Sequence, residues 1–251
     1  MFRRLPYPPL VAFVLALAPV AASLQANQPA PEAILMANPN ADHPAYADLI
    51  TAIKQTVDQD QMISGVVSAI KRQFASMPEF AEAEADSPGL IEEVAASLRP
   101  ILTRQNRRVQ ALYRPEMVAL FASSLTPAEA RSIAEFRRFD LGRKLAGAVM
   151  QAYAPDATLS GIQSETPVTA DQVREDISTA VVSGIGQLSP EELCQMGEMV
   201  MANPALLKLQ QVNPAIQQIL VKMENEPLTT EENTAIDEAV EAVFDRRFFA
   251  Q

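Results

Sequence analysis

The chain has 251 residues, a formal net charge of −11, one Cys, one His and no Trp. A single Cys excludes an intramolecular disulfide framework. A single His excludes a His-cluster metal site and most histidine-based catalysis. The acidic balance argues against a dedicated nucleic-acid-binding protein. A hydrophobic share of 48% with only eight Gly argues against wholesale disorder.

Residues 1–26 predict a cleaved secretory signal peptide. Arg3 and Arg4 precede an unbroken apolar run over residues 10–18, which is too short to span a bilayer. The small residues that fit a cleavage site are Ala22, Ser23 and Ala26. An uncleaved N-terminal membrane anchor is the alternative. We therefore expect an exported, periplasmic protein with a net charge of −13 after cleavage.

The next segment, residues 27–43, is rich in Pro and Asn and predicts a flexible tether. Its His43 is expected to be a solvent-exposed linker residue. From residue 44 onward, apolar residues recur at helical spacing, and no segment shows sustained alternation of period two. The many Ala, Glu, Gln, Met and Leu residues also favour helices. The sequence therefore predicts an all-α fold, a multi-helix bundle of helical hairpins.

Composition predicts two helical units behind the tether. Their ranges are 44–154 for unit 1, 155–168 for a linker rich in Pro, Ser and Gly, and 169–251 for unit 2. Within unit 1, residues 77–88 predict an acidic loop. Ser87 and Pro88 predict the start of the next helix, as a cap followed by Pro at the first helical position. Pro100 is expected to kink or break that helix.

Three helix starts share one pattern, a Ser or Thr followed three residues later by Glu. They begin at Thr126, Ser189 and Thr229, and each predicts a capping box. Thr169 is also predicted to cap a helix. The first two starts lie 63 residues apart, with polar breaks near Asp140 and near Asn203. This spacing indicates either an internal duplication of a helix–break–helix unit or two independently capped helices.

One segment, residues 113–154, carries a family motif. Its matching residues are Thr126, Pro127, Glu129, Phe136, Gly142 and Lys144. The motif resembles the bacterial envelope family catalogued as domain of unknown function 2059, with a candidate repeat at 186–222. The positions that depart from the family's Tyr, Ser and Pro are Arg137, Phe139 and Asp140. The resemblance implies a small exported helical domain and no assigned activity.

Gly142 has a physical interpretation apart from the resemblance. It lies two residues after Asp140, where a helix is expected to end. A Gly there permits either a left-handed residue or a close approach between helices. We therefore predict a helical hairpin whose corner depends on Gly142.

Charge is unevenly distributed along the chain. Residues 99–144 have a net charge of +6, whereas residues 27–98 have −8 and residues 145–251 have −11. Nine of the ten basic residues in the first range are Arg, which pairs with carboxylate or phosphate through two hydrogen bonds. The candidate binding residues are Arg107, Arg108, Arg137, Arg138, Arg143 and Lys144. This block either pairs with acidic segments of the same chain or forms a face that binds an anion.

Catalytic and metal-binding patterns are weak. The sequence lacks nucleophile-elbow, phosphate-loop, dinucleotide and calcium-loop motifs, so we predict no metal and no cofactor. Cys194, Met196, Met199 and Met201 could form a soft-metal cluster, but core packing is the favoured interpretation. Cys194 itself is expected to be a buried small hydrophobe, with an intermolecular disulfide or a redox thiol as the alternative.

Function is therefore predicted only in outline. The favoured interpretation is an exported, non-catalytic binding module whose partner is an envelope protein or an anionic polymer. One alternative is an envelope-polymer hydrolase that uses paired carboxylates, for which opposed buried acids in a cleft would be required. Another is a structural helical subunit, which would expose an apolar stripe and form a homo-oligomer.

Overall fold

A computed structural model of the chain describes residues 42–158 and 166–249. Those residues form an all-α bundle, which confirms the predicted fold class, and they contain no strand. The helices are α1 (Pro44–Gln55), α2 (Gln59–Ser76), α3 (Pro78–Asp86), α4 (Leu90–Ser124), α5 (Pro127–Arg138), α6 (Asp140–Ala152), α8 (Ala170–Ile185), α9 (Pro190–Ala202), α10 (Pro204–Glu224), α11 (Thr230–Phe244) and the short π-helical segment η1 (Asp245–Phe249). The predicted signal peptide lies outside the described residues.

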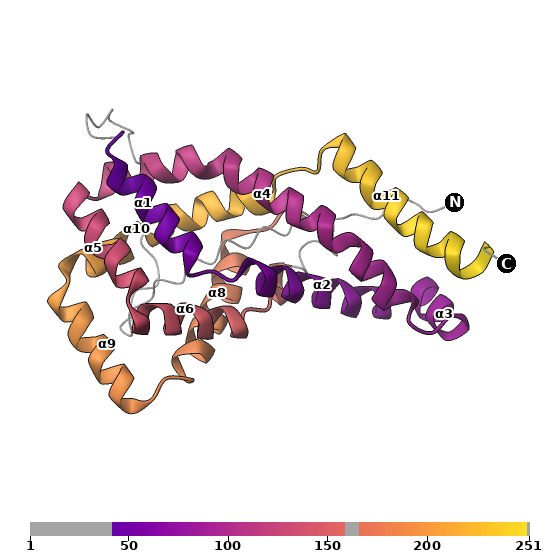
Figure 1. Cartoon of the computed structure of the whole chain (residues 1–251), viewed down its shortest axis with the longest axis horizontal. Helices are drawn as coiled ribbons and strands as arrows, with labels where there is room; N and C mark the ends of the chain where they lie inside the picture. Colours follow the sequence, from indigo (N-terminus) through magenta and orange to yellow (C-terminus); the bar gives the residue numbers. More distant parts are fainter. Residues whose placement is uncertain (1–41, 159–165, 250–251) are drawn as a thin grey trace.

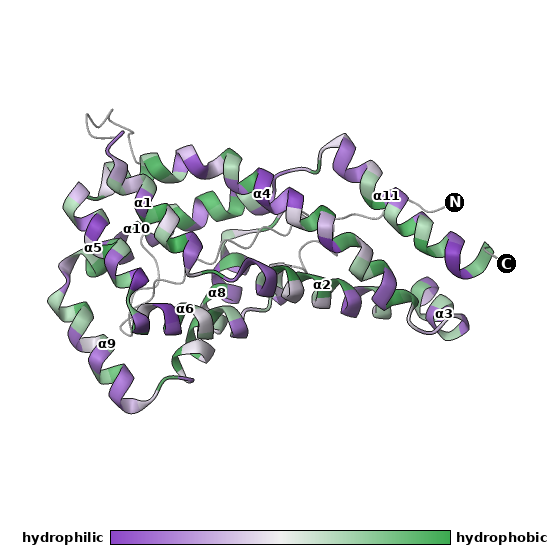
Figure 2. Ribbon diagram, in the orientation of Figure 1, coloured by the Kyte–Doolittle hydropathy of each residue, from purple (hydrophilic) through white to green (hydrophobic). Residues whose placement is uncertain are grey.

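The long helix α4 extends across the upper part of the molecule, with α2 below it (Figure 1). Helix α2 runs antiparallel to α4, since Gln59 donates to Gln110 (3.4 Å) at one end and Lys71 pairs with Glu92 at the other. Its apolar face, from Met62 to Phe74, is buried. Figure 2 shows hydrophobic and hydrophilic residues interleaved along the helices, as expected when each helix has one buried and one exposed face.

Two consecutive helices, α10 and α11, return along the other side of α4 (Figure 1). Lys222 pairs with Glu116, and Arg108 pairs with Glu232 further along. Arg246 then reaches Glu93, near the start of α4. Helices α10 and α11 of the second range, 169–251, therefore pack along the central helix of residues 44–154. The buried apolar side chains of both ranges belong to one cluster.

Helix α4 is continuous from Leu90 to Ser124, although Pro100 and Pro115 lie inside it. The sequence predicts that Pro100 kinks or breaks this helix. The helix does not end there, so the predicted break was wrong. A Pro removes one intrahelical hydrogen bond. The burial of apolar residues on both sides of Pro100 compensates for this lost hydrogen bond, since Leu98 is 1% exposed and Ile101 is 4% exposed.

The predicted acidic loop at 77–88 is also helical, as α3. Pro78 occupies a first-turn position, and Phe80 anchors the helix by stacking on Phe74 at 4.4 Å between ring centroids. Ser87 does not cap the following helix, because it ends α3. Instead, the N-terminal amides of α4 donate to the carboxylate of Glu84, at 2.7 and 2.8 Å.

His43 is not an exposed linker residue. Its Nδ1 accepts a hydrogen bond from the Ala45 amide (3.1 Å) at the start of α1, and its ring packs edge-on to Tyr46. Residues 27–41 of the predicted tether lie outside the described residues. In the predicted linker, Val168 is buried and exchanges two hydrogen bonds with Asn225, so its described end is fixed to the end of α10.

The caps predicted at Thr126, Thr169, Ser189 and Thr229 are confirmed, and each is a capping box. The polar breaks fall between α5 and α6 and between α9 and α10, as the spacing indicates. The internal duplication stays a prediction. Cys194 is exposed on α9, so its predicted burial was wrong; α9 projects from the body, and only Met196 and Val200 on it are buried (Figure 1).

Gly142 allows a close approach but is not itself the corner residue. Phe139 occupies the corner between α5 and α6, and Gly142 lies in the first turn of α6. A Cβ atom on Gly142 would lie 2.1 Å from the carbonyl oxygen of Phe136. The left-handed conformation that the sequence also allows at Gly142 is not found there. Among the described Gly residues, only Gly89 has a positive φ.

We expect the substitution Gly142→Ala to reduce the free energy of unfolding by about 2–3 kcal/mol, because its methyl group collides with backbone that cannot move aside alone. Gly147→Ala is the matched control in the same helix, since nothing lies within 4 Å of its Cβ position. That control should be neutral or stabilising by up to about 1 kcal/mol. Urea unfolding of both variants checks this, and equal effects would contradict the close approach.

Candidate functional site

Most of the predicted basic face is paired within the chain. Arg108 donates two hydrogen bonds of 2.8 Å to Glu232 and a third to the carbonyl of Pro227 (3.1 Å). Arg138 donates two to Asp48, at 3.0 and 2.5 Å. The pKa of Asp48 is lowered chiefly by the hydrogen bonds from Arg138. These two Arg side chains connect helices and stabilise the bundle.

The remaining members of that face divide into three cases. Arg143 pairs with Asp140 one turn earlier, and Lys144 pairs with Glu192 of α9 at 2.5 Å. Arg137 is 2% exposed, and burial lowers its pKa to about 10. Arg107 is exposed and has no hydrogen bond or ion pair among the described residues. The structure therefore does not bring the six predicted residues together as one surface.

The motif residues Thr126, Pro127, Glu129, Phe136 and Gly142 have structural positions. Glu129 accepts from the Thr126 amide (2.7 Å), and the Glu129 amide donates to the Thr126 hydroxyl (3.3 Å). Lys208 of α10 also donates to Glu129, at 2.9 Å. These contacts lower the pKa of Glu129, with the Thr126 amide as the largest cause. The motif fixes α5 to α10.

A different set of cations remains available to a ligand. In the part of the chain that the structure describes, four surface Lys and Arg side chains have no hydrogen bond or ion pair, and we call them the cationic stripe: Lys54, Arg104, Arg107 and Arg114. The three Arg are exposed on α4, and Lys54 is half-buried in the last turn of α1.

Helix geometry aligns these four cations. Arg107 and Arg114 are seven residues apart, and Arg104 lies one turn before Arg107, so all three occupy one side of α4. The row extends about 15 Å along the helix axis, at about 1.5 Å per residue. Lys54 joins it at the Arg114 end, since both line one pocket. Burial, and secondarily the charge of Arg114, lower the pKa of Lys54.

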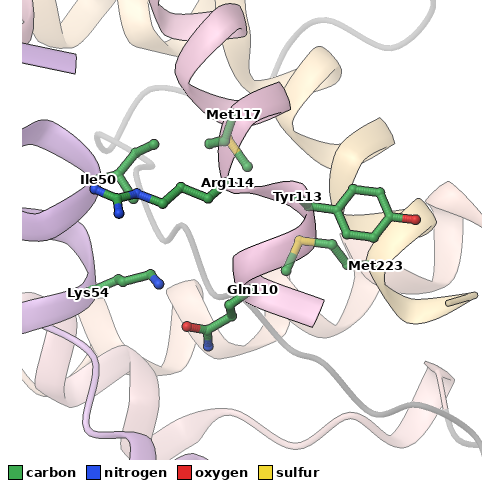
Figure 3. Close-up of a pocket in the computed structure, with 7 residues that line it drawn as sticks. All are labelled: Ile50, Lys54, Gln110, Tyr113, Arg114, Met117 and Met223. Carbon is green, nitrogen blue, oxygen red and sulfur yellow. The ribbon is translucent and has the colours of Figure 1, made fainter. Parts of the chain in front are cut away.

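That pocket lies between α1, α4 and α10 and is a small hollow open to solvent, with room for about one water molecule. Its apolar lining consists of Ile50, Met117 and Met223, which are 2–4% exposed. The Arg114 side chain extends from α4 toward Ile50, and the Lys54 ammonium points toward Gln110 (Figure 3).

No carboxylate lines the pocket; its other lining residues are Gln110 and Tyr113. The amide nitrogen of Gln110 donates to Asn106 (3.0 Å), and the Tyr113 hydroxyl donates to Glu226 (2.8 Å) on the far side. Burial and this contact raise the pKa of Tyr113 to about 12. Two cations beside apolar side chains, without an acidic partner, can bind an anion but provide no acid–base pair for catalysis.

Several carboxylates have structural partners. The carboxylate of Asp176, which is 4% exposed, accepts from the amides of Ala157 and Thr158, both at 2.9 Å. Glu192 and Glu232, each of which follows another Glu in the sequence, close capping boxes. A second buried acid, Glu224, is also 4% exposed; burial first, and then the charges of Glu224 and Asp176, raise the pKa of Tyr153. The hydrolase alternative stays a prediction.

The soft-metal cluster is not assembled. Met196 is 1% exposed, whereas Met201 is 77% exposed and Cys194 is exposed on the same helix. No group of three or more His, Cys, Asp or Glu side chains converges within the described ranges 42–158 and 166–249. The large exposed apolar side chains, which the structural-subunit alternative would gather into a stripe, lie on separate elements: Leu112, Phe139, Val182, Met201, Leu207 and Phe249.

The sequence placed Arg104, Arg107 and Arg114 in its basic block but offered only Arg107 as a binding residue. Their i, i+3, i+10 spacing places the three on one side of a helix, so the sequence pattern could have identified them as one group. Lys54 could not be found this way, because its approach to Arg114 depends on how α1 packs against α4.

No protein-family model, curated protein sequence or solved structure matches the chain. The family resemblance at 113–154 therefore stays a prediction. Of the helices in the described part of the chain, none combines the length and the apolar character needed to cross a bilayer.

We expect Lys54→Met to increase the free energy of unfolding by roughly 0.5 kcal/mol at pH 7, because it removes a half-buried charge that faces Arg114. The folded-state pKa of Lys54 lies below its usual value near 10.5, so the penalty is complete below the folded pKa. The difference between variant and parent should therefore vanish above about pH 10.5.

Urea unfolding at pH 7 and at higher pH measures this difference. The matched control is Lys144→Met, which breaks the ion pair with Glu192 and should destabilise by less than about 1 kcal/mol. A destabilised Lys54→Met variant would show that the Lys54 charge has a stabilising partner.

Proposed function

We propose that the chain is an exported, non-catalytic protein that binds a linear anionic polymer of the cell envelope along the cationic stripe. The observation that carries this proposal is the alignment of Arg104, Arg107 and Arg114 with Lys54, none of which has an ion-pair or hydrogen-bond partner among the described residues. The predicted signal peptide supports the location. Only a few of the positive charges in residues 99–144 therefore remain available to bind a ligand.

Net charge favours a narrow ligand. The chain after predicted cleavage has a net charge of −13, so a broad anionic surface would face repulsion beyond the stripe. A single polymer chain can follow α4 and contact the stripe alone. Screening over about 8 Å at physiological salt limits repulsion from more distant acids. Arg side chains also match phosphate and carboxylate groups through two parallel hydrogen bonds.

The test compares two charge-reversal variants for binding to linear polyphosphate and to poly-glutamate. We expect the variant R104E/R107E/R114E to bind at least tenfold more weakly than the parent, with a weaker dependence on salt. The control R143E/K144E reverses two charges that are paired within the chain and should change affinity less than threefold.

Circular dichroism confirms that both variants fold. Equal loss in the two variants would show that net charge, and not the stripe, determines binding. A parent protein that binds neither polymer would overturn the proposal. Crosslinking in a native envelope extract, with the same variants, would then show whether an acidic protein occupies the stripe instead.

A further inference from the structure

Helix α9 exposes a face that its own chain does not cover. Two of its 13 residues are buried, and its main helix contact is with α10. Its exposed residues include Glu191, Cys194, Glu198 and Met201, and the side chain of Met201 is 77% exposed. At 3.6 residues per turn, these four lie on one side of the helix. Helix α9 therefore presents two acids together with uncharged side chains.

The two acids on this face have no cation beside them. Within residues 42–158 and 166–249, Glu198 has no hydrogen bond or ion pair. The carboxylate of Glu191 has hydrogen bonds with the Ser189 side chain and with its own backbone, at the start of the helix. By contrast, the neighbouring Glu192 pairs with Lys144. Both exposed acids therefore remain available to a cation from another molecule.

The spacing of these acids matches that of the cationic stripe. Glu191 and Glu198 are seven residues apart, and so are Arg107 and Arg114. Seven residues make almost two full helical turns, so each pair lies on one side of its helix and spans about 10.5 Å. Two acids on one helix can therefore face two cations on the other at the same time.

An antiparallel arrangement of the two helices brings both pairs into register. Cys194 lies three residues after the first acid of α9, and Ala111, which is exposed, lies three residues before the second Arg of α4. Antiparallel helices with Ala111 opposite Cys194 therefore set each Arg opposite a Glu. The two small side chains allow the helix axes to approach closely. The same register sets Met201 beside the aliphatic stem of Arg104, which can cover it.

The acidic face and the stripe do not meet within one chain. Figure 1 shows α4 across the top of the molecule and α9 at the lower left. We propose that α9 of one copy docks antiparallel on the cationic stripe of a second copy. Because the two faces differ, each copy keeps one free stripe or one free α9, and assembly continues into a ring or a filament.

The inference goes beyond the proposed function and does not depend on it. The net charge of −11 opposes close approach between copies, so the association is weak and sensitive to salt. A polymer on the stripe and α9 of a second copy would compete for Arg107 and Arg114. Polymer binding would therefore separate the copies.

Sedimentation velocity over a concentration series tests the docking. We expect the parent to associate at low ionic strength and to be monomeric at about 1 M salt, where the screening length is about 3 Å. The variants E191K/E198K and R107E/R114E should each associate at least tenfold more weakly. An equal mixture of the two should associate again, because the acidic α9 of one variant meets the intact stripe of the other.

The matched control is E231K/E238K on α11. These exposed Glu residues occupy the second and ninth positions of their helix, as Glu191 and Glu198 do on α9, and the change in charge is the same. Helix α11 already packs along α4 of its own chain, so this control should not weaken association. Equal losses in the two Lys variants would show that net charge determines association and would overturn the docking. Circular dichroism confirms that all variants fold.

Crosslinking tests the register. In the variant Ala111→Cys, a short bifunctional maleimide should join the introduced thiol to Cys194 of a second copy, as identified by mass spectrometry. Ala96→Cys is the control, since Ala96 is also exposed on α4 but lies about 22 Å from Ala111 along the helix. Equal yields from the two variants would contradict the register. Crosslinks mainly between two Cys194 residues would show that α9 pairs with itself.

The outcomes separate this inference from the proposed function. Polyphosphate should dissociate the parent assembly, and E191K/E198K should bind polyphosphate at least as tightly as the parent because its stripe is intact. A parent that binds polyphosphate but stays monomeric up to about 1 mM, an affinity of only about 4 kcal/mol, would overturn the docking alone. A parent that associates but binds no polymer would overturn the proposed function alone. An assembly that polyphosphate binds without dissociating would contradict docking on the stripe.

Discussion

A helix of 35 residues extends about 50 Å, and the apolar side of α4 must be buried along all of that length. No single helix of ordinary size can cover it. The chain solves this with α2 on one side and with α10 followed by α11 on the other, all antiparallel to α4. The core between these helices is mainly apolar. Ion pairs along the contacts, such as that of Arg108 with Glu232, fix how the helices are oriented relative to one another. Removal of the antiparallel partners would leave α4 marginal, because isolated helices gain little stability in water.

This architecture also decides which charges remain available. Three basic residues of α4, α5 and α6, namely Arg108, Arg138 and Lys144, pair with acids of α11, α1 and α9, and those contacts stabilise the fold modestly. Lys54 and Arg114 are different, since two like charges share one opening and the pKa of Lys54 is lowered by burial and by Arg114. A chain shaped by stability alone has no reason to keep such a pair. The repulsion between these two cations destabilises the unliganded protein, as expected of a site that binds an anion.

Sequence reasoning succeeded where the physics is local. The capping boxes at Thr126, Ser189 and Thr229 depend on residues three apart, so the chain itself contains the full information. It failed where distant segments decide. Pro100 breaks an isolated helix, but packing from both sides holds α4 together. Arg108 and Glu232 lie 124 residues apart, and nothing in their local sequence indicates that they meet. The six residues of the predicted basic face therefore do not form one surface, and the binding face stays a prediction.

The register of α4 connects the stripe to the pocket. Arg107 and Arg114 lie on one side of the helix, and Gln110 and Met117 lie about one-sixth of a turn away, facing α1 and α10. Anion binding at Arg114 would relieve the repulsion between Lys54 and Arg114, so the free energy released adds to affinity and raises the pKa of Lys54. Binding should therefore stabilise the packing of α1 against α4, which couples binding of the anion to the long helix on which the bundle depends.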